Sequence, residues 1–319
     1  MRHHLKFDPF GLLYVAVVGA GGTRSHLVTL LTEVHKGIVA LGGAGLHVTL
    51  YDDDEVSYTN TIRQNYGPQE IGRNKAVTLM TRVNLACSLT WTAVPTRFTA
   101  AQLPPSAQMY GPQCPHVVFT CVDTNAARRE IGEAFVQSRA GYWIDTGNAQ
   151  TTGQVLLSEP RGVGGKPRLP TPLEEYGELL GIDEEDTPSC SALESLTRQD
   201  LMINREVAVK AVGLWWRLLR NGFVKHRGLI INADEGFTMP KRIEEGMVPE
   251  YATPPVGLIP ADQPQEVPLD LLGSEAGAGA TPEAPAPAKP RKPRAKTGTR
   301  APRKPRTTPG GPVAEPPVG

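Results

Sequence analysis

The stretch Y-V-A-V-V-G-A-G-G-T-R-S, residues 14–25, decides how this chain folds. Its first five residues form a short apolar run bounded by glycine, which is typical of a buried β-strand. Gly19, Gly21 and Gly22 then permit a tight turn, and apolar residues recur at helical spacing from Ser25 onward. A strand that leads through glycines into a helix brings backbone N–H groups to a place where they can bind a phosphate. We therefore expect an α/β domain with a nucleotide site at this turn.

The glycine turn departs from the pattern G-x-G-x-x-G at its last position, where Arg24 stands. Two interpretations of Arg24 stay open. Its guanidinium reaches over the phosphates as an extra cation, or it crowds the site and impairs nucleotide binding. For the glycine turn as a whole, the alternative is a structural turn that binds no ligand.

Strand-like and helix-like segments alternate along the chain, which predicts parallel β-α-β units. The fold class that we expect is a Rossmann-like, doubly wound α/β fold with a mostly parallel sheet and antiparallel C-terminal strands. We expect parallel strands at 14–18, 46–51, 89–95, 116–122 and 142–145, antiparallel or closing strands at 153–158, 229–232 and 235–238, and helices at 25–34, 72–84, 125–137 and 191–220.

Composition narrows the class of protein. The chain has 319 residues and lacks the run of about 20 apolar residues that a membrane helix needs. The first apolar run leads into glycines and not into a cleavage site, so we expect no signal peptide. Four unevenly spaced cysteines (Cys87, Cys114, Cys121 and Cys190) favour a reducing cytoplasm.

Two domains are expected from the shift in composition near residue 240. Residues 1–240 read as the folded domain, with a long crossover loop at about 159–190 that holds one short helix. Residues 241–319 read as a linker and a disordered tail, in which nine Lys or Arg and two acids follow position 280. The tail either keeps the protein soluble or makes a weak contact with nucleic acid or another acidic surface.

A second stretch, Y-D-D-D-E-V-S-Y-T-N-T-I-R-Q-N-Y-G-P-Q-E-I-G-R-N-K-A at 51–76, carries dense polar chemistry directly after a strand. Asp52 stands where a nucleotide ribose is held in doubly wound folds. Its spacing from the glycines exceeds the usual ~20 residues, which we attribute to a flexible segment at Gly37–Gly45. Two amides and two cations follow that suit phosphates better than a nicotinamide: Asn60, Gln64, Arg63 and Lys75. Ordinary surface charges are the alternative.

Four motifs together resemble the ThiF/MoeB/ubiquitin-activating enzyme superfamily over residues 12–240. They are V-V-G-A-G-G-T (17–23), L-Y-D-D-D-E-V-S-Y-T-N-T-I-R-Q (50–64), I-G-R-N-K-A (71–76) and T-C-V-D-T-N-A-A-R (120–128). With P-S-C-S-A-L-E-S-L-T-R-Q-D-L-M-I-N (188–204), the chain is most similar to the PRTRC-system ThiF-family branch.

The resemblance implies adenylation, with ATP and Mg²⁺, of the C-terminal carboxylate of a small ubiquitin-like protein, and it implies a homodimer. It assigns Asp52 to the ribose, Asn60, Arg63, Gln64 and Lys75 to the phosphates, and Asp123 to Mg²⁺, with Asp54 among the nucleotide-binding residues. For Asp123 a helix N-cap is the alternative, and Arg128 is expected to be a structural cation.

Cys190 precedes S-A-L-E (191–194), which fits a capping box at the start of a helix. The positive end of that helix favours a thiolate, as a nucleophile that takes over the acyl group requires. A small buried side chain under the loop is the alternative. The other three cysteines are expected to be structural.

Departures from the superfamily also shape the expectations. Paired C-x-x-C motifs are missing, so we expect no zinc. The upstream arginine of many relatives has no counterpart, because Arg2 is a poor candidate and His3–His4 reads as a frayed terminus. Trp215 and Trp216 are expected in the core. Two rival functions remain, a nicotinamide-dependent oxidoreductase and a non-enzymatic module that only binds the ubiquitin-like partner.

Overall fold

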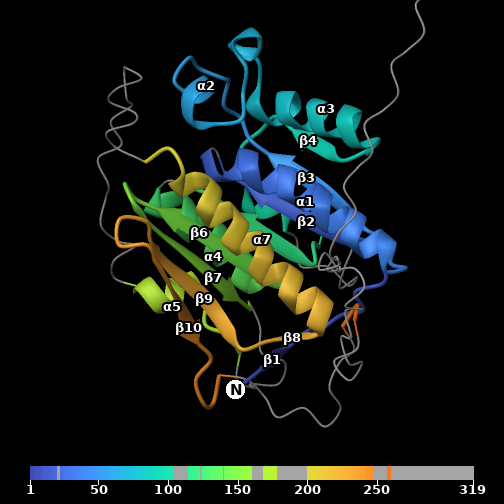
Figure 1. The fold of residues 1–319 in the computed structure, drawn as a ribbon, viewed down its shortest axis with the longest axis vertical. Helices are drawn as coiled ribbons and strands as arrows, with labels where there is room; N and C mark the ends of the chain where they lie inside the picture. Colours follow the sequence, from blue (N-terminus) through green and yellow to red (C-terminus); the bar gives the residue numbers. More distant parts are fainter. Residues whose placement is uncertain are drawn as a thin grey trace, which may run out of the picture. The chain divides into compact units, whose positions relative to one another are not determined.

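The described part of the chain comes from a computed structural model (Figure 1). The structure describes residues 1–19, 22–103, 114–122, 124–138, 140–159, 168–177, 200–247 and 257–259, without the side chains of Arg63 and Ala100. The chain divides into two units, Met1–Gln265 and Glu266–Gly319, and every described residue lies in the first.

The described residues form one large sheet with the strand order β10-β9-β7-β6-β5-β2-β3-β4. β2, β3, β4, β5 and β6 run parallel, whereas β7, β9 and β10 join antiparallel beyond β6. This arrangement confirms the expected fold class. The strands are β2 (Leu13–Val18), β3 (Leu46–Tyr51), β4 (Thr92–Val94), β5 (Val117–Thr120), β6 (Tyr142–Asn148), β7 (Thr152–Ser158), β9 (His226–Asn232) and β10 (Phe237–Arg242).

Helices cover both faces of the sheet (Figure 1). α1 (Gly22–Ala40), α3 (Lys75–Cys87) and α7 (Ile203–Asn221) share one apolar core with one face. α4 (Asn125–Gln137) packs on the other face in a separate core that includes Phe135 and Trp143. The shorter helices are α2 (Asn60–Arg63), α5 (Pro172–Tyr176) and the 3₁₀ turns η1 (Pro68–Glu70) and η2 (Ala100–Gln102).

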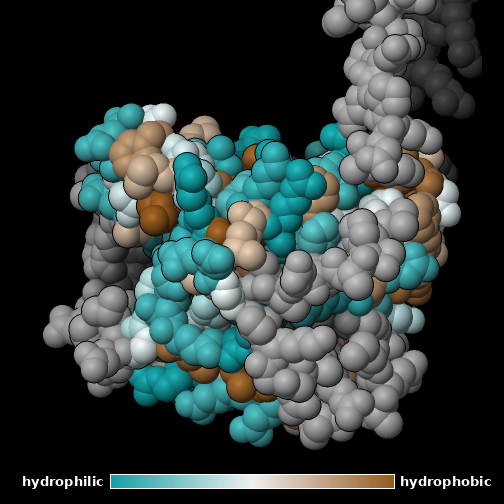
Figure 2. All heavy atoms as spheres, turned by 90° about the horizontal axis from the view of Figure 1, so that it is seen from below, coloured by the Kyte–Doolittle hydropathy of each residue, from teal (hydrophilic) through white to brown (hydrophobic). Residues whose placement is uncertain are grey.

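Apolar side chains that remain exposed are scattered. Leu85 on α3 and Met239 on β10 are examples. On the face shown in Figure 2, hydrophobic residues appear in small groups among hydrophilic ones. No helix among the described residues has both the length and the apolar character to cross a membrane.

Two predictions, one of a flexible segment and one of a helix, need correction. The segment Gly37–Gly45 is not a flexible insertion, because α1 continues to Ala40 and a short turn follows with Gly42 and Gly45 at positive φ. The helix predicted over 191–220 is not continuous, because residues 200–202 are non-helical and α7 begins at Ile203. There the Asp200 side chain accepts a hydrogen bond from the Met202 N–H at 2.8 Å, which closes a local turn. Residues 191–199 lie outside the described part.

Both ends of the folded domain also differ from the prediction. The expected boundary at 240 falls inside β10, and Leu258 lies in the core, where its N–H donates to the Leu219 carbonyl at 2.9 Å. At the other end, His3–His4 is not frayed: it forms strand β1, which pairs with β8 (Phe223–Val224). His3 is fully buried, and burial lowers its pKa to about 3.

Candidate functional site

The site lies where the strand order reverses. After β2 the chain moves outward through β3 and β4 on one side, and it returns to place β5 and β6 on the other side. Ligands of open α/β sheets bind in the crevice outside the carboxyl ends of strands at such a switch point. A cavity of about 350 Å³ occupies this position. It is lined by Val18 and Gly19 after β2, by Tyr51, Asp52, Asp53 and Asp54 after β3, by Val122 and Thr124 after β5, by Arg97 and Phe98, and by Ala127, Glu130 and Ile131 of α4.

Gly19 and Gly22, the two described glycines of the turn, are required for different structural reasons. Gly19 has φ +114°, and a Cβ there would lie 2.6 Å from the Cys121 carbonyl oxygen, so only glycine fits. Gly22 starts α1, and a Cβ there would lie 2.7 Å from the Asn204 side chain. Gly22 therefore allows α1 and α7 to approach closely. Gly21 lies outside the described residues.

Asn204 was missed by the sequence analysis. It is buried at the start of α7, and its Oδ1 accepts a hydrogen bond from Thr23 Oγ1 at 3.1 Å. Thr23 also lies within 3.3 Å of Asn148 Oδ1 at the end of β6. These three side chains join the first turn of α1 to β6 and α7. No local sequence signal predicts a contact across 181 residues.

Arg24 turns inward and does not reach over the cavity. Its side chain is fully buried, forms an ion pair with Asp52 and donates a hydrogen bond to the Gly19 carbonyl. Asp52 is therefore paired with a cation, and its predicted role toward a ribose stays a prediction. Within the described part of the chain, the Arg24 atoms Nε and Nη2 are buried without a hydrogen-bond partner.

The three consecutive acids have three different environments. Asp52 is buried against Arg24, and its Oδ1 accepts a hydrogen bond from the Asp54 N–H at 3.0 Å. Asp54 Oδ2 lies 2.8 Å from Lys75 Nζ. Asp53 is exposed at the cavity. One oxygen of each carboxylate lies within 4.8 Å of the others.

Asn74 fixes this acidic turn to α3. Its side-chain Nδ2 donates to the carbonyls of Asp52 and Asp54, at 2.9 and 3.2 Å, and its Oδ1 caps α3 by accepting from the Val77 N–H. Lys75 consequently begins α3 beside Asp54 and is only 8 % exposed. Asn directly before a helical pattern is a preferred N-cap, so this residue was predictable.

Three of the four predicted phosphate residues, Asn60, Arg63 and Gln64, lie on α2 or directly after it. The N–H of Asn65, directly after this segment, donates to Ser25 Oγ in the first turn of α1 at 3.1 Å. Asn60 uses its Oδ1 locally, accepting from the Ser57 N–H at 2.8 Å. Gln64 Oε1 is buried and has no hydrogen-bond partner among the residues that the structure describes. The structure thus brings the segment to the N-terminus of α1, where anions are favoured.

The position predicted for Mg²⁺, Asp123, lies outside the described residues, but its neighbours are well defined. The N-cap of α4 is Thr124, whose side chain accepts from the Ala127 N–H, so the alternative of Asp123 as that cap is wrong. Arg128 donates to the Val122 carbonyl at 3.1 Å and to Asn125 Oδ1 at 3.2 Å. It therefore holds the residues on both sides of position 123.

Arg128 is the structural cation that the sequence suggested. Its Nε lies 3.1 and 3.0 Å from the two carboxylate oxygens of Asp145 on β6. Complete burial raises the pKa of Asp145, even though Arg128 and a hydrogen bond from Thr120 favour its charged form. Asp145 was not identified from the sequence, because its partner lies on another element.

The cysteines give a divided result. Cys190 lies outside the described residues, so its proposed role stays a prediction. Cys121 follows β5 directly and is buried, and this burial raises the pKa of its thiol to about 11. A thiol of this kind is a poor nucleophile. Cys87 is partly exposed, and Cys114 is buried.

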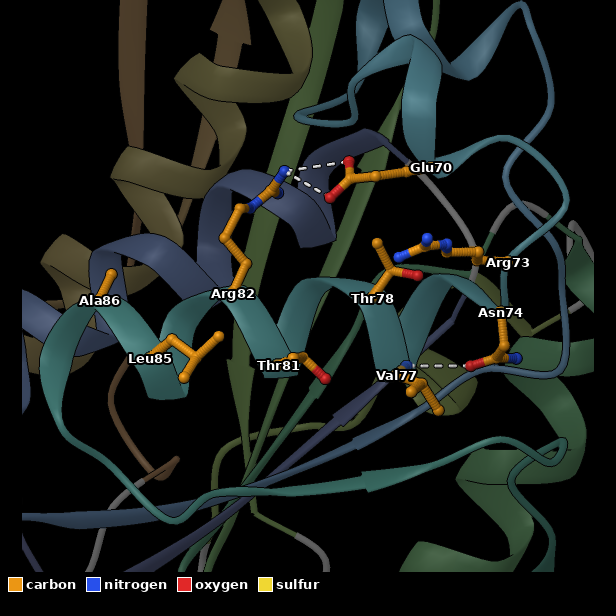
Figure 3. A pocket seen from close by; sticks show the side chains of 9 residues that line it. All are labelled: Glu70, Arg73, Asn74, Val77, Thr78, Thr81, Arg82, Leu85 and Ala86. Atoms are coloured by element: carbon orange, nitrogen blue, oxygen red, sulfur yellow. Dashed lines mark hydrogen bonds and ion pairs between the residues drawn. The ribbon is translucent and has the colours of Figure 1, made fainter. Parts of the chain in front are cut away.

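A second cavity, of about 820 Å³, lies along the outer side of α3 and shares no lining residue with the first. Figure 3 shows the Arg82 guanidinium bonded to both oxygens of Glu70, at 3.3 and 3.1 Å, beside Thr78 and Arg73. The acid of this cavity, Glu70, thus pairs with the cation Arg82, which lines the same cavity.

The chain is similar to solved structures and matches the model of a protein family. The structure of E. coli MccB with ATP is similar to this chain, with 14% sequence identity and a TM-score of 0.48 over 75% of this chain and 65% of that chain. The structure of E. coli MccB with AMPCPP and SeMet MccA has 15% sequence identity and a TM-score of 0.48 over 74% of this chain and 65% of that chain. The structure of SeMet PaaA has 13% sequence identity and a TM-score of 0.49 over 72% of this chain and 64% of that chain. This chain thus spans slightly less than two thirds of those chains. No curated protein matches it. The model of the ThiF family matches residues 12–192, more than half of the chain, and the protein therefore belongs to the ThiF family.

Proposed function

We propose that the protein uses ATP and Mg²⁺ to adenylate the C-terminal carboxylate of a ubiquitin-like small protein. The observation that carries the proposal is the cavity at the switch point, bounded by the Gly19 turn and by the acids after β3. Membership of the ThiF family supports the reaction class. The partner's identity as a ubiquitin-like protein of a PRTRC system rests on the sequence resemblance alone.

The two ends of ATP would occupy different parts of the site. The apolar wall made by Phe98, Val122 and Ile131 suits the base. The first turn of α1 suits the phosphates, because free N–H groups and the helix dipole favour anions there. Arg63 and Gln64 come from the adjoining segment and Lys75 from the first turn of α3, and Gln64 Oε1 is buried without a hydrogen-bond partner among the described residues.

The reaction needs positioning and neutralisation of charge. An oxygen of the partner's carboxylate attacks the α-phosphorus of ATP, the bond from that phosphorus to the bridging oxygen breaks, and pyrophosphate leaves with the electron pair. The product is an acyl-adenylate. Lys75 and Arg63 would offset the charge that develops on the leaving group.

The residues around position 123 fit a hard cation. A carboxylate at the carboxyl end of β5, between cavity-lining Val122 and Thr124, offers the oxygen ligand that Mg²⁺ prefers. Asp123 would hold the ion, with Arg128 bonded to the Val122 carbonyl before it and to the Asn125 side chain after it. When bound, Mg²⁺ neutralises phosphate charge. Transfer of the acyl group to Cys190 and a homodimeric assembly are further parts of the proposal.

ATP–pyrophosphate exchange tests the proposal. Labelled pyrophosphate, ATP and a candidate ubiquitin-like protein should give labelled ATP, and the same partner without its last two residues should not. Arg63→Ala should lower exchange at least ~100-fold, as loss of a transition-state contact does. The matched control is Arg73→Ala, on the outer side of α3, which should keep exchange. Exchange that survives Arg63→Ala unchanged contradicts the proposed site.

One observation favours a second candidate function. Arg24 already pairs with Asp52, as a module that has lost ATP use and only binds its partner would allow. Such a module binds the ubiquitin-like protein in pull-down assays but gives no exchange. The two candidates therefore separate in the same experiment.

A further inference from the structure

We propose that Asp53, and not Asp52, binds the ribose hydroxyls of the nucleotide. This inference rests on the proposed function, because it concerns how ATP is held. It assigns a specificity-determining residue that differs from the position expected from the fold, and the reason lies in Arg24.

The ion pair with Arg24 makes Asp52 unavailable to the ribose hydroxyls. The carboxylate of Asp52 is 1 % exposed, and the buried guanidinium of Arg24 is its counter-ion. A ribose that bound Asp52 would have to displace a charged group with a pair of uncharged hydroxyls. Because a buried guanidinium without its carboxylate is very unfavourable, this exchange is not expected.

Lys75 occupies Asp54 in a similar way. Lys75 Nζ lies 2.8 Å from Asp54 Oδ2, and the lysine is held in place as the first residue of α3. Asn74 also ties the Asp54 carbonyl to α3. Two of the three acids after β3 therefore have a cation of their own.

Among the described acids that line the cavity, Asp53 is the one whose carboxylate has no cation beside it. It lines the 350 Å³ cavity, is exposed, and has no hydrogen bond or ion pair within the described part of the chain. The two oxygens of a carboxylate can accept hydrogen bonds from both hydroxyls of a ribose. Arg97, the nearest cavity-lining cation along the chain, lies 3.0 Å from Glu130 and does not pair with Asp53.

The replacement of the third glycine thus shifts the ribose contact by one residue along the chain. With glycine at position 24 Asp52 would have no counter-ion and could bind the hydroxyls itself. With arginine there, the neighbouring acid takes over, and the cavity still offers one free carboxylate.

Nucleotides that lack one ribose hydroxyl test the inference directly. The purified full-length chain is titrated calorimetrically with ATP, 2′-deoxy-ATP and 3′-deoxy-ATP in the presence of Mg²⁺. The unaltered protein should bind both deoxy-nucleotides ~10-fold more weakly than ATP, since each loses a hydrogen bond to a charged group. Asp53→Asn should bind all three with nearly equal affinity. Asp53 is exposed, so this variant should fold.

Glu130→Gln is the matched control, an exposed acid on the other side of the same cavity, and it should keep the ~10-fold preference. If Asp53→Asn also keeps that preference, the inference is wrong while ATP binding stands. If the unaltered protein binds no nucleotide, the proposed function and the inference both fall.

A second variant tests the role of Arg24. In Arg24→Gly/Asp53→Asn, Asp52 has lost its counter-ion and can accept the hydroxyls, so the preference for ATP should return. Equal binding of all three nucleotides by this folded double variant contradicts the explanation through Arg24. Should the double variant not fold, the Asp53→Asn titration decides alone.

Discussion

Two buried Arg–Asp pairs stand at the carboxyl edge of the same sheet, and they differ in how fully the arginine is bonded. Arg128 reaches Asp145, Asn125 and the Val122 carbonyl, so its Nε, Nη1 and Nη2 all have partners. Arg24 reaches Asp52 and the Gly19 carbonyl, while its Nε and Nη2 have no partner among the described residues.

This difference in hydrogen bonding distinguishes the structural pair Arg128–Asp145 from the pair Arg24–Asp52, which lies at the candidate site. A buried donor without a partner costs free energy, so proteins rarely keep one without a reason. Arg128 sits between strand and helix and fastens both. Arg24 sits at a glycine turn beside a cavity, and two of its nitrogen atoms have no hydrogen-bond partner among the described residues. We therefore expect substitutions at the two positions to affect different properties.

The largest expected effect is on stability, at the fully bonded pair. Arg128→Ala leaves Asp145 buried without its counter-ion and should lower the free energy of unfolding by ~3–5 kcal/mol. Arg24→Ala should lower it less, because the Arg24 Nε and Nη2 atoms have no hydrogen bond to lose among the described residues. Urea unfolding followed by circular dichroism measures both. Equal losses would show that the two pairs do not differ in kind.

A pH titration extends the comparison to a buried group at the N-terminus. His3 Nδ1 lies 3.6 Å from Glu159, but burial dominates and lowers the pKa of His3 from 6.5 to about 3. Between these values the unfolded chain binds a proton that the folded protein does not, so stability falls as pH drops from 6.5 toward 3.

The expected loss over that range is up to ~4 kcal/mol, at ~1.4 kcal/mol for each pH unit. Urea unfolding at a series of pH values should show a shallower slope for His3→Gln than for the unaltered protein. An unchanged slope would mean that His3 is not buried as a neutral ring.

The two glycines of the turn give a smaller, separable effect. Gly22→Ala should cost ~1–3 kcal/mol, because its Cβ meets the Asn204 side chain. Shortening that side chain in Gly22→Ala/Asn204→Ser should restore part of the loss. Gly19→Ala meets the backbone of Cys121 and cannot be rescued in this way. Thermal melting of the three variants provides the test, and Gly22→Ala without any loss would contradict the close contact.

The smallest effect is expected at an exposed pair on the rim of the cavity. Arg97 lies 3.0 Å from Glu130, but the side chains are 62 % and 46 % exposed. Solvent screening limits such a pair to ~0–1 kcal/mol. Arg97→Ala should therefore leave the urea midpoint nearly unchanged. A loss comparable to that of Arg128→Ala would show that exposure does not distinguish these pairs.

Sequence patterns predicted the elements well, because strand and helix periodicity is local. The buried runs became β2, β3 and β5, and Thr124 and Asn74 cap helices as short polar residues before a helix do. What failed was pairing over distance. The contact of Arg24 with Asp52 depends on which way a long side chain turns.

The closing strands show the same limit at the end of the domain. β10 contains a Pro and ends in charged residues, so its composition resembles the linker that follows more than a strand. Its place at the edge of the sheet, where a proline is tolerated, explains why it still pairs with β9. Asp123 and Cys190 remain predictions from sequence, because neither lies in the described part.

The most direct test of the central claim is calorimetric titration of the purified, folded chain with ATP and Mg²⁺. We predict saturable binding with one ATP per chain, strongly weakened in Lys75→Ala. A folded protein that binds no ATP under these conditions would contradict the account.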